Sequence, residues 1–318
     1  MNAGDDVFRG RRIVIPAPSH QVITRTGEID HARRERGLRG LRSLGMIPVM
    51  MGGAFECMGR LAGDDERRAA DFEQALLSRE ADLVMAFRGG YGMTRVLPLL
   101  DWERIGRATL PMVGYSDFTA FNLALLAKTG RPSWHGPMLM SFERLDPFMV
   151  KRFGVVFGAD PGSLEWEGEA GLIGSGTAGR FTGTLWGGNL CLIESLVGTR
   201  WFPSDAVEGG ILFLEDVDEA AYRVERMLLT LLEAGILEKQ KAILIGSFTG
   251  ADDAWRFEGD YTVASVLGTI RRRLPARIPM VTGFPFGHVP PQATLPVGVP
   301  AELELSGTHA ALAFGGLR

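Results

Sequence analysis

The first half of the chain alternates short unbroken apolar runs with longer stretches of helical periodicity. The apolar runs predict four buried strands, at Arg12–Pro16, Ile47–Met50, Ala81–Phe87 and Pro111–Gly114. Helical spacing predicts intervening helices at about residues 28–44, 64–78, 96–100 and 117–128. Apolar strands that alternate with helices are typical of a parallel sheet covered on both faces.

The pattern changes between about residues 160 and 180, where Gly, Ser and Glu dominate and the periodicity is lost. Such a segment is typical of a connection between domains. We therefore expect an N-terminal α/β domain over residues 1–160, a connection over 161–180 and a C-terminal domain over 181–318. In the last of these we expect helices at 187–197 and 219–234, strands at 211–214 and 242–245, and antiparallel β structure at 294–314.

Composition narrows the class of protein. The 318 residues are 46% hydrophobic, with a mean hydropathy of +0.07, which excludes a disordered chain and is enough for two cores. A net charge of −4 argues against a nucleic-acid surface. Neither a membrane span nor a signal peptide is apparent, so we expect a cytoplasmic protein. Cys57 and Cys191 have apolar neighbours and are expected to be buried thiols.

Glycine is the unusual residue, with 42 of 318 positions against a usual share of about 7%. Three of these glycines follow a predicted strand in Arg88-Gly89-Gly90-Tyr91-Gly92. Glycine allows the backbone to approach a ligand closely, although a plain tight turn would also use it. The segment matches neither common phosphate-binding motif, so a nucleotide site is a weak alternative.

A candidate nucleophile lies where the fourth strand meets the next helix, in Gly114-Tyr115-Ser116-Asp117. A serine on a sharp strand-to-helix turn exposes its hydroxyl at the carboxyl edge of the sheet, beside the N–H groups of a helix start. The match to the G-x-S-x-G pattern is partial, because the last position is Phe118. A helix N-cap is the alternative role for Ser116.

Such a serine needs a base and an acid that orients it. Of the five histidines, His288 lies among Gly and Pro on a stiff loop, where an oriented base is expected. Glu215 ends a strongly apolar strand and could reach a neighbouring loop. The alternatives are a solvent-exposed loop histidine and a carboxylate that caps the following helix.

Seven short segments, taken in order, resemble the LD-carboxypeptidase family of serine peptidases, the murein tetrapeptide carboxypeptidases. They run nearly end to end, and their order is more specific than any one of them. The segments are Ile13–Ser19, Arg88–Gly92, Gly114–Asp117, His135–Met138, Gly187–Leu190, Leu214–Asp216 with Tyr222–Met227, and Phe286–His288.

The resemblance implies a Ser–His–Glu triad, for which Ser116, His288 and Glu215 occupy the motif positions. Glu219 competes for the role of the acid, but it opens an exposed helix whereas Glu215 lies at a fixed strand tip. The resemblance also implies a flavodoxin-like N-terminal domain, a C-terminal domain with a small β-barrel-like sheet, and a homodimer.

The implied reaction is hydrolysis of the L,D amide bond that releases terminal D-alanine from cytoplasmic murein tetrapeptides, in cell-wall recycling. We expect the backbone N–H groups of Asp117 and of Gly89 or Gly90 to hold the oxyanion. Arg88 or Arg95 is the candidate that binds the terminal carboxylate of the substrate. No cofactor or metal is expected.

Three rival functions remain open. A serine hydrolase on the same scaffold could cleave a peptide-antibiotic amide for self-immunity. A binding protein could keep the scaffold alone, although the three triad positions are intact. A glutamine-amidotransferase-like protein would need cysteine at the turn, where this chain has Ser116.

Overall fold

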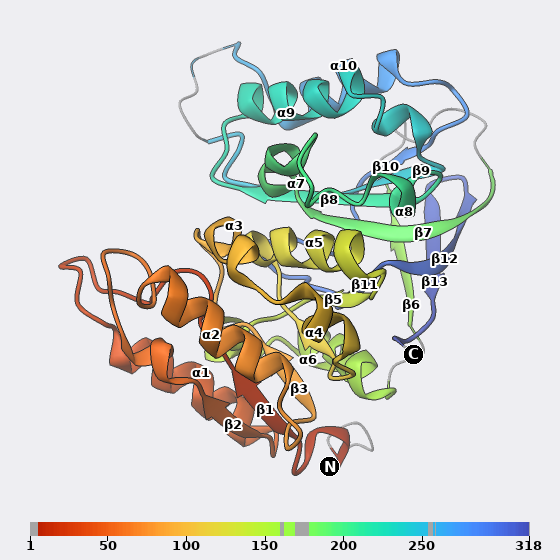
Figure 1. Cartoon of the computed structure of the whole chain (residues 1–318). Coiled ribbons are helices and arrows are strands. Elements are labelled where there is room, and N and C mark those ends of the chain that lie inside the picture. Colours follow the sequence, from red (N-terminus) through yellow and green to blue (C-terminus); the bar gives the residue numbers. More distant parts are fainter. Residues whose placement is uncertain (1–5, 160–161, 169–177, 254–256, 258, 318) are drawn as a thin grey trace.

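The computed structural model describes residues 6–159, 162–168, 178–253, 257 and 259–317. It contains two sheets, of six and seven strands. Figure 1 shows them in two lobes, with helix α5 (Thr119–Thr129) lying between the lobes. This mixed α/β architecture confirms the predicted fold class.

The first sheet has the strand order β11-β5-β4-β3-β1-β2. Its first five strands in the chain are parallel, and the order β2-β1-β3-β4-β5 is that of a flavodoxin-like sheet. The strands are β1 (Arg12–Ile15), β2 (Ile47–Met50), β3 (Leu83–Met85), β4 (Met112–Val113), β5 (Ser133–His135) and β11 (Leu295–Val297).

Helices connect the parallel strands of this sheet, and aspartates begin several of them. Each of four N-cap aspartates accepts a hydrogen bond from the backbone N–H three residues further on, which satisfies a free donor of the first turn. These aspartates are Asp30, Asp64, Asp101 and Asp146. The helices in this half, besides α5, are α1 (His31–Ser43), α2 (Asp65–Leu76), α3 (Met93–Val96), α4 (Trp102–Arg107) and α6 (Pro147–Phe153).

The second sheet has the order β10-β9-β8-β7-β12-β13-β6 and curls into a half-barrel. Strands β7 to β10 are parallel, whereas β12, β13 and β6 are antiparallel. The strands are β6 (Ser163–Glu167), β7 (Gly179–Asn189), β8 (Ile211–Val217), β9 (Ala242–Thr249), β10 (Met280–Val281), β12 (Val299–Ser306) and β13 (His309–Phe314). Its helices are α7 (Leu190–Leu196), α8 (Ser204–Val207), α9 (Ala221–Glu233) and α10 (Val263–Arg273).

The prediction of a helix over residues 187–197 is wrong at its start. Strand β7 continues to Asn189, and helix α7 begins only at Leu190. Gly187 and Gly188 have φ values of 146° and 138°, which are not helical, and a Cβ on Gly187 would lie 1.9 Å from the Phe213 carbonyl oxygen. Gly187 therefore serves close packing against β8, whereas a Cβ on Gly188 would lie 2.6 Å from the Thr119 hydroxyl of α5.

Two further differences concern the expected domains. Residues 163–167 of the expected connection form β6, which buries Leu164 and Trp166, while residues 161 and 169–177 lie outside the described ranges. Strand β11 comes from the C-terminal third but pairs antiparallel with β5 of the first sheet. The domain boundaries stay a prediction. Strand β11 belongs to the expected C-terminal domain by its position in the chain, but it is part of the first sheet.

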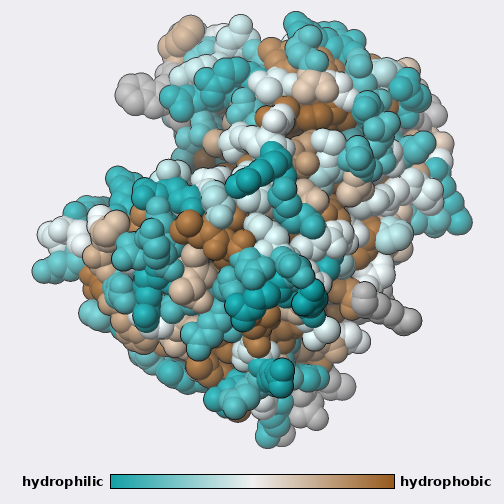
Figure 2. Space-filling model, viewed as in Figure 1, coloured by the Kyte–Doolittle hydropathy of each residue, from teal (hydrophilic) through white to brown (hydrophobic). Residues whose placement is uncertain are grey.

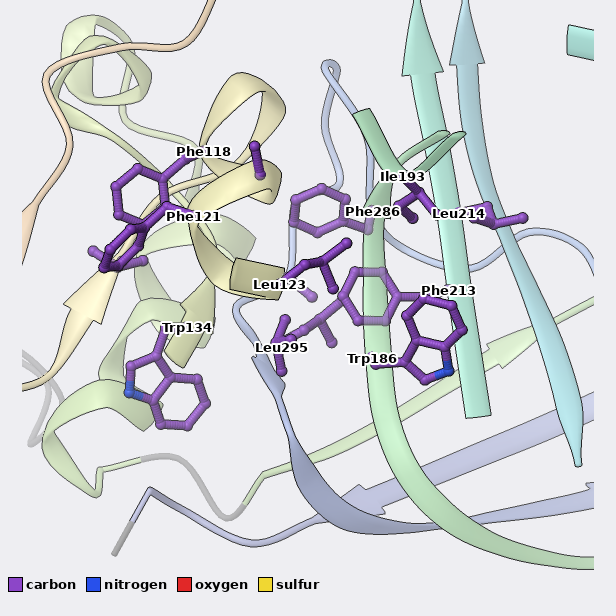
Figure 3. Close-up of a cluster of buried hydrophobic side chains, with 14 of the residues drawn as sticks. Phe118, Phe121, Leu123, Trp134, Trp186, Ile193, Phe213, Leu214, Phe286 and Leu295 are labelled. Atoms are coloured by element: carbon purple, nitrogen blue, oxygen red, sulfur yellow. The ribbon is translucent and has the colours of Figure 1, made fainter. Parts of the chain in front are cut away.

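One hydrophobic core extends across both sheets. Figure 3 shows Leu123 of α5 and Leu295 of β11 beside Phe213 and Phe286 from the second half of the chain. Figure 2 shows hydrophilic residues over most of the visible surface and an outline indented between the two lobes. The expectation of two buried cysteines is wrong, because Cys57 is exposed and Cys191 is only partly buried. No helix in the described ranges is long and apolar enough to span a membrane.

Candidate active site

Ser116 lies on a strained turn at the carboxyl end of β4. Its φ is +60°, a value that non-glycine residues seldom adopt and that is often found at functional sites. A 3-10 turn over Ser116–Phe118 leads directly into α5, and neither element is capped by a serine side chain. The N-cap alternative for Ser116 is therefore not what the structure shows. Gly114 permits the sharp turn, because a Cβ there would lie 2.6 Å from the Phe118 ring.

The structure brings His288 and Glu215 together, although they are 73 residues apart in the chain. The His288 Nδ1 atom is 2.6 Å from Glu215 Oε2. The Glu215 side chain is fully buried on β8, and that of His288 is only 16% exposed. With the proton on Nδ1 donated to the carboxylate, Nε2 is the free acceptor, which is the tautomer that a general base needs.

The surroundings of His288 favour its charged form. Burial alone lowers its pKa, but the hydrogen bond and charge of Glu215, with the charges of Asp216 and Asp218, raise it above the usual 6.5. The competing carboxylate, Glu219, lies just before helix α9 and is instead 3.5 Å from the guanidinium of Arg223 in that helix. The geometry therefore favours Glu215 as the partner of the histidine.

A cavity of about 430 Å³ joins the two halves of this site. Ser116 and Tyr115 line it from the first half of the chain, and His288 lines it from the second. The Tyr115 ring packs edge-on against the His288 ring, with 5.0 Å between their centroids. A larger cavity, of about 860 Å³, lies beside α2 and includes none of these residues.

The glycine loop after β3 approaches the candidate nucleophile closely. A Cβ on Gly89 would lie 2.8 Å from Ser116 Oγ and 3.3 Å from the backbone nitrogen of Asp117. Gly90 has a φ of +107°, and a Cβ on it would lie 2.3 Å from a ring nitrogen of His20. Glycine is thus required for the loop to reach this position, and its backbone lies next to that of the turn.

The two candidate arginines have different surroundings. Arg88 lines the cavity, donates to the Gln21 carbonyl oxygen at 3.1 Å, and forms no ion pair with any described carboxylate. Burial and the nearby Arg33 lower its pKa. Arg95 is not among the residues that line the cavity, and its guanidinium is 2.8 Å from Asp65. The structure thus favours Arg88 over Arg95 as a group that could bind an anion.

Three cavity residues were missed by the sequence reasoning. Arg33 of α1 and Arg144 add positive charge to the lining, and the Tyr115 ring supports His288. Arg33 also pairs with Glu143 at 2.6 Å. Only the place of Tyr115 next to Ser116 was a usable signal, because nothing in the local sequence brings the two arginines to this cavity.

Comparison with known proteins agrees with this geometry. The family model for the LD-carboxypeptidase N-terminal domain matches residues 13–136, and the model for the C-terminal domain matches residues 182–303. The murein tetrapeptide carboxypeptidase of Pseudomonas aeruginosa is 33% identical over 92% of this chain and 93% of its own. The microcin C7 self-immunity protein MccF of Escherichia coli is 27% identical over 75% of each chain.

Solved structures show the same fold. The crystal structure of a muramoyltetrapeptide carboxypeptidase from Oxalobacter formigenes has a TM-score of 0.82 and 37% identity, and covers 96% of this chain and 98% of that one. Structures of MccF also have TM-scores of 0.82, but at 23% identity they support the fold alone. With both family models matched over most of its length, the chain belongs to the LD-carboxypeptidase family.

Proposed function

We propose that this protein is a serine carboxypeptidase that releases terminal D-alanine from murein tetrapeptides by cleaving an L,D amide bond. The observation that carries the proposal is the 2.6 Å contact of His288 with the buried Glu215, at a cavity that Ser116 also lines. The relatives named as murein tetrapeptide and muramoyltetrapeptide carboxypeptidases support this class of substrate.

In the proposed mechanism Ser116 Oγ attacks the carbonyl carbon of the scissile amide while His288 Nε2 accepts its proton. The histidine then donates that proton to the departing amine of D-alanine. Water, activated by the same histidine, hydrolyses the ester on Ser116 and releases the tripeptide. Glu215 fixes the imidazole tautomer and stabilises its cation throughout, because their hydrogen bond is short and buried.

The negative oxygen that forms on the scissile carbonyl needs donors that are already in place. We propose the backbone N–H of Asp117 together with that of Gly89 or Gly90, as expected from the sequence. The close approach of Gly89 to both Ser116 Oγ and the Asp117 nitrogen supports this assignment. Fixed backbone donors of this kind contribute about 2.7–4 kcal/mol each to lowering the barrier.

We assign the free carboxylate of the substrate to Arg88, which has no carboxylate partner among the described residues and lies on the cavity wall with Ser116. Its planar guanidinium can hold a carboxylate through two parallel hydrogen bonds. Arg95 is not carried into the proposal, because it is engaged by Asp65.

The location and assembly of the protein also belong to the proposal. We place the reaction in the cytoplasm, on wall fragments that are being recycled, and we expect a homodimer. Light scattering on the purified protein would test the assembly, since a mass near the 34.6 kDa of one chain would exclude the dimer.

The decisive experiment incubates the protein with purified murein tetrapeptide and follows the products by mass spectrometry. The proposal predicts a tripeptide and one D-alanine per turnover. The Ser116→Ala variant should be slower by about 10⁴- to 10⁶-fold. A wild-type protein that leaves the tetrapeptide intact would exclude this function.

A second candidate function is hydrolysis of a peptide-antibiotic amide for self-immunity, which the similarity to MccF favours. Both functions use the same proposed triad, so triad variants do not separate them. A competition assay with both substrates separates the two functions. The proposal predicts a higher kcat/KM for the tetrapeptide than for an aminoacyl sulfamoyl adenosine. The opposite ranking would favour the self-immunity function.

A further inference from the structure

The side chain of Asp117 lies apart from the cavity that its neighbour Ser116 lines. Its carboxylate is buried, with the residue only 2% exposed, and it does not contribute to the cavity wall. One oxygen, Oδ2, accepts two hydrogen bonds, from Ser19 Oγ at 2.6 Å and from the Met93 backbone nitrogen at 2.8 Å. The proposed mechanism uses only the backbone N–H of this residue, so the carboxylate has no role in it.

These two hydrogen bonds join three segments that are far apart in the sequence. Asp117 belongs to the turn that carries Ser116, and Ser19 belongs to the loop after β1. Met93 is the first residue of α3 and directly follows the glycine loop Arg88–Gly92. A single carboxylate oxygen therefore fixes the end of the glycine loop to the turn after β4.

A buried arginine strengthens the same connections. The Arg68 side chain of α2 has no exposed surface, and its guanidinium donates to the carbonyl oxygens of Pro18 and, at 3.0 Å, Gly92. These acceptors immediately precede Ser19 and Met93, the two residues that donate to Asp117. We refer to Ser19, Arg68, Met93 and Asp117 as the Asp117 network.

The start of the glycine loop is attached to the same neighbouring loop. The backbone nitrogen of Phe87 donates to the Pro16 carbonyl oxygen at 2.9 Å, and that of His20 donates to the Gly89 carbonyl oxygen at 3.4 Å. The loop is thus held at both ends, and at its far end the attachment runs through Asp117. Between these ends, Gly89 lies against Ser116 Oγ and the Asp117 nitrogen.

We propose that the Asp117 carboxylate is a positioning group which, with Ser19, holds the glycine-loop N–H groups and the Asp117 N–H at the spacing that an oxyanion requires. The inference rests on the function proposed above. Its physical reason is that an oxyanion hole works through preorganised donors, and a displacement of about 1 Å can reduce a rate by about 10²-fold.

Three variants change the two hydrogen bonds of the Asp117 carboxylate to different extents. Asp117→Ala removes both, and we expect kcat to fall by about 10²-fold with KM nearly unchanged. Asp117→Asn keeps an oxygen that can accept both, and should recover most of that loss. Ser19→Ala removes one bond and should lower kcat by a smaller factor, while leaving the Met93 contact in place.

The matched control is Asp71→Asn, which changes another buried aspartate of the same half. Its carboxylate accepts from the Gly53 nitrogen at 2.6 Å and is 3.4 Å from the Arg67 guanidinium, and neither interaction involves the turn or the glycine loop. If the Asp117 network only stabilised the fold, all these variants, including Asp71→Asn, would lower the activity only by reducing the folded fraction. Each kcat is therefore referred to the amount of folded protein from calorimetry.

A second measurement separates this inference from the proposed substrate. Fluorophosphonates modify an activated serine through an oxyanion-like transition state without any peptide, so their rate of reaction with Ser116 reports the same donors. We expect this rate to fall in Asp117→Ala and Ser19→Ala and to be restored in Asp117→Asn. If the tetrapeptide were not cleaved but the labelling rates of the variants still followed the expected order, only the proposed substrate would be wrong. Wild-type labelling rates and kcat in well-folded Asp117→Ala and Ser19→Ala would overturn the positioning role.

Discussion

The two halves of the candidate site are built by different means. In the first half, backbone conformation positions the groups: Ser116 has a positive φ and the glycine loop packs against its hydroxyl. In the second half, a side chain positions the group: the fully buried Glu215 holds His288 by one short hydrogen bond. From this difference we expect the proposed nucleophile and its proposed donors to be sensitive to added atoms, and the proposed base to be sensitive to changes of charge.

Replacing the acid tests the second half most severely. Glu215→Gln keeps the size of the side chain but removes the charge that stabilises the imidazolium, and it can present an N–H to His288. We expect kcat to fall by about 10³- to 10⁴-fold, measured as D-alanine release.

Glu219→Gln provides the matched control for this change, because Glu219 lies just before α9 and pairs with Arg223 of that helix instead of with His288. Its activity should stay at the wild-type level. If the Glu219 variant lost activity and the Glu215 variant kept it, the assignment of the acid would be reversed.

Adding one methyl group tests the first half. Gly89→Ala places a carbon 2.7 Å from Ser116 Cβ and 2.8 Å from its Oγ, which forces the loop or the turn to move. We expect kcat to fall by about 10²-fold, because the nucleophile and donors are displaced together.

Gly268→Ala in helix α10 is a suitable comparison, since a Cβ there meets only the end of the Arg272 side chain at 3.6 Å. This variant should keep its activity. An active Gly89→Ala enzyme with normal kcat would show that the close approach of the loop is unimportant.

The positive charge on the cavity wall is expected to act on binding more than on chemistry. Arg88→Met should raise KM for the tetrapeptide by about 10- to 100-fold, the effect of losing a charged hydrogen bond of about 1.5–3 kcal/mol. Arg95→Met removes the pair with Asp65 and the contact with Tyr91, both outside the cavity wall, and should leave KM unchanged. Equal KM values for both variants and the wild type would remove Arg88 from the proposal.

The smallest effect expected is a shift in pH dependence. A general base must be neutral, and the carboxylates around His288 raise its pKa above 6.5. Therefore kcat/KM should fall as the pH decreases through a value above 6.5. In Glu215→Gln the acid limb of the residual activity should move to lower pH, because the charge of Glu215 no longer raises the pKa of His288. An acid limb that did not move would show that another group titrates.

Much of the fold was predictable because its signals are local. The apolar runs that became β1 to β4 have the periodicity of buried parallel strands, and the order of the elements implied their covering helices. The end of strand β7 was not predictable, because its glycines are explained only by close packing in the folded chain, Gly187 against Phe213 of β8 and Gly188 against Thr119 of α5. Strand β11 was expected as β structure, but its pairing with β5 joins residues about 160 apart in the chain.

The candidate site was predictable to a different extent. The turn at Ser116 is a local feature, so strand, glycine and helix start were visible in sequence. The pairing of His288 with Glu215 came from the family resemblance, since no local pattern joins residues separated by 73 positions. The carboxylate contacts of Asp117 were missed for the same reason, because Ser19 and Met93 reach it only through the folded sheet.

The central claim is that Ser116 is the nucleophile activated by His288 and Glu215. The most direct measurement is reaction with a fluorophosphonate followed by peptide mapping and determination of the labelling rate. The account predicts a single adduct on Ser116, absent in Ser116→Ala, and much slower labelling in Glu215→Gln than in the wild type. An adduct on a different residue, or labelling of Ser116 at the wild-type rate in Glu215→Gln, would contradict it.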